Sequence, residues 1–151
     1  MWQLLTVLYL GQFWSDFSSF ESSSVTLQLS HSKLSVFNIY RPPFSSIYSK
    51  PFSVFLDDFS SFLSFAATTP HEFIITGDFN IHLDNPADTL TSQFLSLLSS
   101  FNHSQHVHFP THDKSHILDL VIPFPTRHSL RLFLAPIGLH LTTFLSSPDC
   151  L

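Results

Sequence analysis

The pattern of apolar and polar residues in the first third of the chain predicts a β-hairpin. Val25, Leu27 and Leu29 alternate with polar residues, which is typical of a strand with one buried face. After a short polar turn, residues 34–40 form a more apolar segment that can pair with this strand. Two prolines at 42–43 then end the second strand, because proline lacks a backbone N–H to donate. The serine-rich residues up to Ser24 are expected to form a loop, and the apolar residues 1–10 are expected to be a strand or unrelated sequence.

Two later segments have the spacing of amphipathic helices. Apolar residues recur every three or four positions across residues 52–66, with Ser49 available as a cap, and again across residues 90–101, after Asp88 as a cap. We interpret both apolar stripes as core packing. Their members are Phe52, Phe55, Leu56, Phe59, Phe62, Leu63 and Ala66 in the first helix, and Leu90, Phe94, Leu97, Leu98 and Phe101 in the second.

Between these helices, an apolar strand at residues 73–76 runs directly into Gly77, Asp78, Phe79 and Asn80. Glycine can end a strand abruptly and lets a ligand approach the backbone. Asp78 and Asn80 would then lie at the carboxyl end of a sheet strand, where α/β folds place ligand sites. The alternative is that this sequence is only a turn, since Gly, Asp and Asn are all turn formers.

A polar residue, Asp119, interrupts the apolar strand predicted for residues 117–122. Asp119 needs a partner there, because burying an unpaired carboxylate costs several kcal/mol, roughly. It could bond at a strand end or an exposed edge, or it could orient a catalytic histidine. Pro123 and Pro125 end this strand, and one more is expected at residues 130–134.

Three motifs in this order resemble the endonuclease/exonuclease/phosphatase superfamily. Residues 38–43 (Asn-Ile-Tyr-Arg-Pro-Pro) look like its strand that ends in a Tyr-x-Pro turn, residues 77–80 like its Gly-Asp-x-Asn turn, and residues 118–119 like its Leu-Asp strand. The amino-acid sequence of residues 20–25, 80–86 and 109–112 is most similar to the endonuclease domains of vertebrate LINE-type (non-LTR) retrotransposons. The resemblance covers residues 20–122. It implies an α/β fold, a two-sheet sandwich flanked by helices.

The resemblance also implies roles for individual residues in Mg²⁺-dependent hydrolysis of DNA phosphodiesters. Asp78 would orient or deprotonate the attacking water, and Asn80 and Tyr40 would contact the phosphate. Asp119 would fix a catalytic histidine. Arg41, and also His112 and Ser115 of the turn before the Leu-Asp strand, would face the nucleic acid.

Two family features are not found in the sequence. The family opens with strands that carry an Asn and then a Glu, the main magnesium ligand, and it closes with a Ser-Asp-His strand. We therefore expect residues 1–19 to be an atypical segment, and residues 20–151 a partial domain, N-terminally truncated and with a degenerate C-terminus. His140 could be the remnant of Ser-Asp-His, with Asp149 as a rival. The metal ligands of this chain are left unknown.

Composition fits one domain and weakens the case for strong DNA binding. The chain has 151 residues, 44% of them hydrophobic, which is enough for one core and too few for two domains. Its formal charge of −5 leaves no basic face, so a metal would have to screen the phosphate. The single cysteine, Cys150, excludes an internal disulfide and fits a reducing compartment.

The clustered histidines suggest a zinc site and the apolar N-terminus suggests a membrane signal, but the sequence supports both only weakly. His103, His106, His108, His112 and His116 crowd one irregular segment, but no cysteine or reliable carboxylate completes a four-ligand zinc set. The first ten residues lack a basic start and a cleavage site, and they are shorter than the ~20 residues of a spanning helix. An intracellular location, nuclear or cytoplasmic, is favoured.

The sequence thus predicts a partial Mg²⁺-dependent endonuclease domain that is inactive as this chain. A magnesium-dependent phosphatase of small phosphoesters is an alternative enzyme. A non-catalytic mobile-element relic, or a residual nucleic-acid- or protein-binding module, is the alternative outside enzymes. The oligomeric state and the preferred DNA sequence are not predicted.

Overall fold

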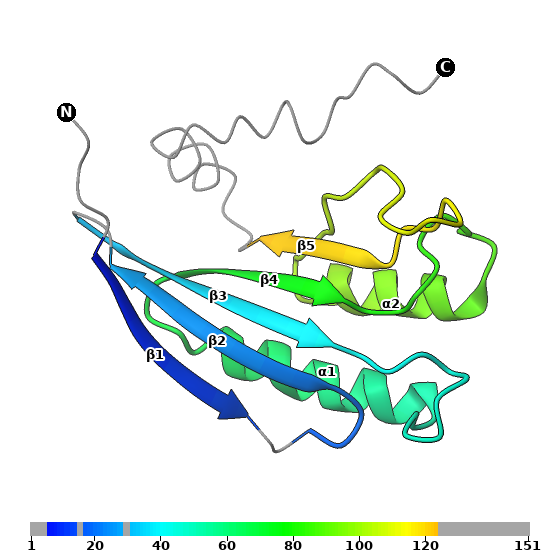
Figure 1. Cartoon of the computed structure of the whole chain (residues 1–151), viewed down its shortest axis with the longest axis horizontal. Helices are drawn as coiled ribbons and strands as arrows, with labels where there is room; N and C mark the ends of the chain where they lie inside the picture. Colours follow the sequence, from blue (N-terminus) through cyan, green and yellow to red (C-terminus); the bar gives the residue numbers. More distant parts are fainter. Residues whose placement is uncertain (1–5, 15–16, 29–30, 124–151) are drawn as a thin grey trace.

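The computed structural model describes residues 6–14, 17–28 and 31–123, which form one five-stranded sheet with two helices (Figure 1). The strands lie side by side in chain order: β1 (Thr6–Trp14), β2 (Glu21–Gln28), β3 (Lys33–Tyr40), β4 (Glu72–Asp78) and β5 (Asp119–Pro123). Neighbouring strands are antiparallel except β3 and β4, which are parallel. Helix α1 (Phe52–Ala66) makes the crossover between those two, and α2 (Thr89–Ser100) follows β4.

The core lies between the helices and one face of the sheet. Every second residue of β3, β4 and β5 faces it, and these residues pack on the stripes predicted for the two helices. Phenylalanine dominates this core because its rings pack edge to face and stacked, as Phe59 does against Phe79 and Phe62. The fully buried members are Ile39, Phe55, Phe59, Phe62, Leu63, Ala66, Phe73, Ile75, Phe79, Phe94, Leu98, Leu120 and Ile122.

The hairpin, both helices and the strands at 73–76 and 117–122 are confirmed, although details of their ends differ. Ser22 to Ser24 belong to β2 and pair with β3, so the expected loop there is wrong. Serine is a weak strand former, but the apolar strand beside it supplies the pairing. Asp88 caps α2 by accepting a hydrogen bond from Leu90 N at 3.3 Å. Ser49 does not cap α1, which begins after Pro51, and its hydroxyl donates to Phe44 O instead.

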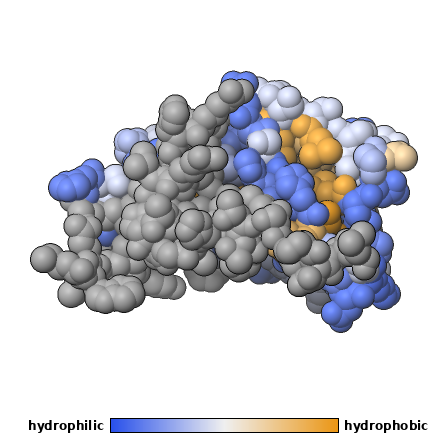
Figure 2. Space-filling view, turned by 90° about the horizontal axis from the view of Figure 1, so that it is seen from above, coloured by the Kyte–Doolittle hydropathy of each residue, from blue (hydrophilic) through white to orange (hydrophobic). Residues whose placement is uncertain are grey.

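The backbone of residues 6–14 pairs with β2, which agrees with the expectation of a strand in this region. The strand expected at residues 130–134 lies outside the described residues. None of the helices in the described part of the chain is long and apolar enough to cross a membrane. On the side drawn in Figure 2, the described surface is mostly hydrophilic around one apolar area.

Candidate functional site

Three of the predicted site residues form one row across the sheet. Tyr40, the last residue of β3, is in register with Asp78, the last residue of β4, and Asp78 is in register with Asp119, the first residue of β5. Parallel strands end at the same edge, and an antiparallel neighbour begins there. Direct cross-strand partners project from the same face of a sheet. Since Ile39 and Leu120, beside them in sequence, face the helices, this row faces away from the helical layer.

Gly77 makes this close arrangement possible. Its φ is +138°, a conformation that side chains rarely adopt, and a Cβ atom there would lie 1.9 Å from Ile39 O. The neighbouring β3 backbone would have to move to accommodate any side chain. The glycine of the Gly-Asp-Phe-Asn turn is therefore required for the pairing of β3 with β4 next to the site.

Asp78 is held in a partly desolvated position. Burial raises the pKa of its carboxyl group, and the nearby Asp119 carboxylate raises this pKa further. The backbone N–H of Asn80 donates to Asp78 Oδ1 at 3.1 Å and lowers the pKa, as does the charge of His112. The net shift is upward, which makes Asp78 a better proton acceptor than an ordinary surface carboxylate.

Asn80 is fixed by its backbone and by its side chain. Its φ of +49° lies in the left-handed region, which asparagine tolerates better than most residues. Its Nδ2 donates to Arg41 O at 2.7 Å. The same side chain also hydrogen-bonds the Asp78 carboxylate and lowers its pKa, so the amide of Asn80 is oriented from two sides.

Arg41 differs from the sequence prediction, which placed it against the substrate. Its side chain is only 2% exposed, and its Nη1 donates to the carbonyls of Phe79 and Asn80, both at 3.2 Å. The guanidinium carbon lies 4.5 to 5.3 Å from the ring centroids of Phe44, Phe52 and Phe55. Arg41 follows the exposed Tyr40, but its side chain returns beneath the turn and bonds its carbonyls. It is a positioning residue for the turn.

Asp119 is exposed and its backbone is anchored by a threonine. Thr111 Oγ1 accepts hydrogen bonds from the backbone N–H groups of Leu118 and Asp119, both at 3.0 Å. Thr111 N in turn donates to His116 O at 2.9 Å. These bonds fix the start of β5 and with it the backbone of Asp119.

His112 and Ser115 belong to the same turn. Both side chains are exposed, and Ser115 N donates to His112 O at 2.9 Å. His112 is close enough to Asp78 for its charge to affect the pKa of that carboxyl group. The turn therefore lies beside the row of Tyr40, Asp78 and Asp119. Ser115 has a φ of +62°, in the left-handed region.

The remaining candidate residues from the sequence are the C-terminal His140 and Asp149 and the histidines at 103–116. His140 and its rival Asp149 lie outside the described residues. The five histidines at 103–116 do not form a zinc site together. His103 is buried with Nδ1 3.1 Å from Pro123 O, and His106 Nε2 is 3.2 Å from Ser104 Oγ. His116 instead meets His82 and Asp84 in a group that could hold a metal ion. Sequence reasoning also missed Glu21, which is exposed and in register with Tyr40.

Comparisons with known proteins support the fold. No family model and no curated protein matches the sequence. A solved structure of humanized D. rerio TDP2 with 14 mutations is similar, with a TM-score of 0.54 and 9% identity over 83% of this chain and 54% of that chain. An endonuclease/exonuclease/phosphatase family protein from Leptotrichia buccalis C-1013-b gives a TM-score of 0.45 and 12% identity, over 68% of this chain and 42% of its own. The chain thus spans about half the length of these structures.

The chain shares the mixed α/β fold of the TDP2 structure over most of its length. This confirms the mixed α/β fold class that the three motifs implied. At such low identity the likeness concerns the fold alone. The described residues form one sheet with two helices packed on one face, and the second sheet that the resemblance implied is not among them. What the site does chemically has to be argued from its own residues.

Proposed function

We propose that this chain carries part of the active site of a metal-dependent phosphodiester hydrolase, derived from a DNA endonuclease of a LINE-type retrotransposon. The observation that carries the proposal is the register of Tyr40, Asp78 and Asp119 at one edge of the sheet, with Asn80 fixed beside Asp78. A phenol, two carboxylates and an amide supply acceptors for a proton and donors for a phosphate. The three family motifs, distant in sequence, meet at this row.

The donor set is compatible with magnesium. Mg²⁺ prefers oxygen ligands and often takes one or two carboxylates, with waters and substrate phosphate completing its shell. Asp78 and Asp119 lie on adjacent strands, and the raised pKa of Asp78 reflects in part the unscreened charge of Asp119. A bound cation would screen these charges and supply charge neutralisation at the phosphate. Among the described residues, these two would be its protein ligands.

Each residue of the row then has a distinct task in phosphodiester hydrolysis. Asp78 orients the attacking water or accepts its proton, from its place in the row next to Tyr40 and Asp119. Asn80 and Tyr40 donate hydrogen bonds to the phosphate oxygens, on which negative charge grows in the transition state. Asp119 orients a histidine that contacts the scissile phosphate, a role for which His140 is the candidate. His112 and Ser115 line the approach of the nucleic acid.

We further propose that residues 20–151 form a partial domain that is inactive as this chain. Two carboxylates within the described residues are a minimal set for Mg²⁺, and the Glu and Ser-Asp-His motifs of the family are not found in the sequence. Removing one transition-state donor typically costs about 10² to 10³ in rate. The intact relative would act on DNA inside the cell, where the single cysteine of this chain would stay reduced.

The first prediction concerns activity on supercoiled plasmid with Mg²⁺. The chain as it stands should not nick the plasmid faster than its Asp78→Ala variant. A repaired chain, with family strands bearing Asn and Glu placed before residue 20 and Ser-Asp-His restored near His140, should nick it. Nicking by the unrepaired chain that disappears in Asp78→Ala would contradict the proposed inactivity. A repaired chain that folds and binds Mg²⁺ but stays inert would contradict the proposed hydrolase.

The alternative is a non-catalytic relic or a residual binding module, and one observation favours it. The loop after β3 exposes three large apolar residues, Phe44, Ile47 and Tyr48, with Ile47 90% and Tyr48 75% exposed. Apolar groups gathered on a surface often mark a contact site. The nucleotide sequence upstream of the Met1 codon discriminates: in-frame codons for the Asn and Glu strands favour the enzyme, and intervening stop codons favour the relic.

A further inference from the structure

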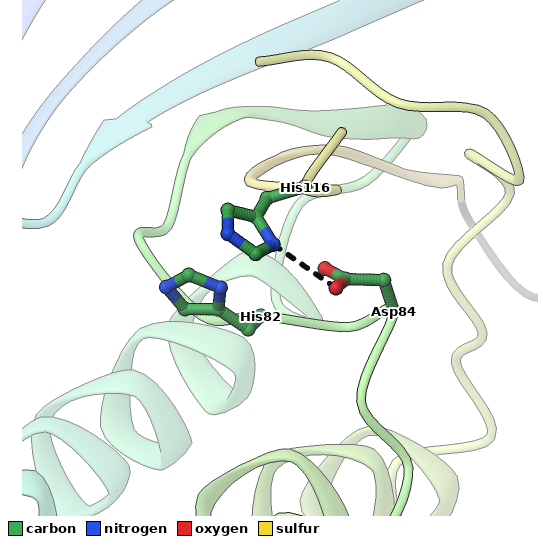
Figure 3. A group of neighbouring side chains, drawn as sticks. All are labelled: His82, Asp84 and His116. Carbon is green, nitrogen blue, oxygen red and sulfur yellow. Dashed lines mark hydrogen bonds and ion pairs between the residues drawn. The ribbon is translucent and has the colours of Figure 1, made fainter. Parts of the chain in front are cut away.

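Three side chains outside the row converge beyond the ends of β4 and β5. His82 and Asp84 follow β4 on the segment after Asn80, and His116 precedes β5 (Figure 3). Their ligand atoms all lie within 4.8 Å of one another. His116 Nδ1 is 3.0 Å from Asp84 Oδ2, and the rings of His82 and His116 meet edge to face with centroids 4.1 Å apart.

Hydrogen bonds fix the backbone segment of His82 and Asp84 to the segment of His116 and to helix α2. Leu83 N donates to Ile117 O at 3.3 Å and Phe79 N donates to Leu118 O at 2.9 Å, so the two segments run alongside each other. His82 O accepts from the hydroxyl of Thr91, a fully buried residue of α2, at 2.9 Å. Little rearrangement is therefore needed to bring the three ligand atoms around an ion.

The carboxylate of Asp84 is also oriented. Its Oδ1 accepts from Ile117 N at 3.1 Å, which leaves Oδ2 directed at His116. Backbone bonds of this kind fix the ligands of metal sites and contribute to their affinity. The ring of His82 makes no hydrogen bond with any of the described residues, although it lies against His116. An ion pair between His116 and Asp84 does not explain why the His82 ring lies beside them. A metal site explains the positions of all three side chains.

We propose that His82, Asp84 and His116 form a binding site for a transition-metal dication, with Zn²⁺ as the fitting ion. Two imidazole nitrogens and one carboxylate oxygen suit zinc, which takes such ligands at about 2.0 to 2.2 Å and is usually four-coordinate. Water would fill the remaining position. Mg²⁺ and Ca²⁺ are disfavoured because they prefer oxygen ligands. This ion would bridge the segments that carry Asn80 and Asp119, and its binding does not require the proposed hydrolysis.

The site can be tested by titrating the full chain with Zn²⁺ in a calorimeter and with Co²⁺ in an absorption spectrometer. We expect one zinc ion per chain and the intense visible bands of four-coordinate cobalt. Zinc should also raise the melting temperature, since a ligand that binds only the folded state stabilises it. A large excess of Mg²⁺ should displace neither ion.

His82→Ala is the decisive variant, because it removes a metal ligand and leaves the His116–Asp84 pair intact. It should bind zinc more than about tenfold more weakly, lose the cobalt bands and melt without metal at nearly the parent temperature. Asp84→Asn and His116→Ala should bind as weakly, and His108→Ala, an exposed histidine outside the group, should bind like the parent. Zinc affinity and cobalt bands unchanged in His82→Ala, or no zinc binding by the parent chain, would overturn the proposal.

Discussion

At the scale of single residues, the site is built by groups that are individually unfavourable for the fold. Gly77 has a φ that only glycine adopts readily, Asn80 has a left-handed φ, and Arg41 is a buried cation without a carboxylate partner among the described residues. Each of them holds the Gly-Asp-Phe-Asn turn in place. Strain and partial burial at one turn are typical of functional sites. The sequence identified Asp78 and Asn80 from the local motif, but it could not reveal that Arg41 is buried, since this depends on the return of the chain beneath it.

Asp78 should cost stability while it serves the chemistry. Burial raises its folded-state pKa above the unfolded value, so the folded state holds the proton more readily. The cost is full above the folded pKa and is relieved as the pH falls through that pKa towards the unfolded value. Asp78→Asn removes the charge and keeps an oxygen for Asn80 N. We predict that it raises the free energy of unfolding at pH 7 by about 1 kcal/mol or less.

Urea unfolding at pH 7 and pH 4 measures this difference. The gain should shrink at the lower pH, where Asp78 of the parent chain takes up a proton. Asp57→Asn, on the exposed face of α1, is the matched control and should change the stability by less than about 0.5 kcal/mol. Loss of stability in Asp78→Asn at pH 7 would show that the carboxylate is better solvated or paired than the structure indicates.

At the scale of elements, the periodicity of apolar residues predicted the elements that bury one face against the core. It missed elements that form through pairing with a neighbouring segment. The helical stripes of α1 and α2 were read correctly because one apolar face repeats every three or four residues. The N-terminal half of β2 was missed, because Ser22 to Ser24 have no apolar alternation and form a strand only through their partners in β3. The group of His82, Asp84 and His116 was missed for the same reason, since Asp84 and His116 are 32 residues apart and only the fold brings them together.

The end of β5 should make the fold sensitive to acid through His103. This histidine is buried against Phe73, and burial lowers its pKa below the usual 6.5. The folded state therefore binds the proton less readily than the unfolded state. The stability is full above about pH 6.5 and is lost as the pH falls through the folded pKa. His103→Phe should cost about 1 kcal/mol at pH 7.5, by losing the bond to Pro123 O, and should lose less than the parent on acidification.

Unfolding curves at pH 7.5 and 5.5 compare the two proteins. His108→Asn, at an exposed position, should follow the parent at both values. An equal loss of stability in the parent and in His103→Phe would assign the acid sensitivity to other histidines, such as His71 or His106, whose pKa values burial also lowers.

At the scale of the whole molecule, charge should govern any contact with DNA. The formal charge is −5 with neutral histidines, and protonation of all ten would bring it to about +5. We predict that the chain binds a fluorescent DNA duplex weakly at pH 7.5 and more tightly as the pH falls below about 6.5. Added salt should weaken the binding at the lower pH. Anisotropy that shows tight, salt-insensitive binding at pH 7.5 would contradict a mainly electrostatic contact.

The central claim is that Tyr40, Asp78, Asn80 and Asp119 act as one phosphodiesterase unit. The most direct measurement is the nicking rate of the repaired chain with Asp78→Ala, Asp119→Ala and both together. Each single variant should lose at least about 10² in rate, and the double variant should be little slower than either, because residues of one unit are not additive. His108→Ala should keep the full rate. An Asp119→Ala protein that folds, binds Mg²⁺ and nicks as fast as the repaired chain would contradict the account.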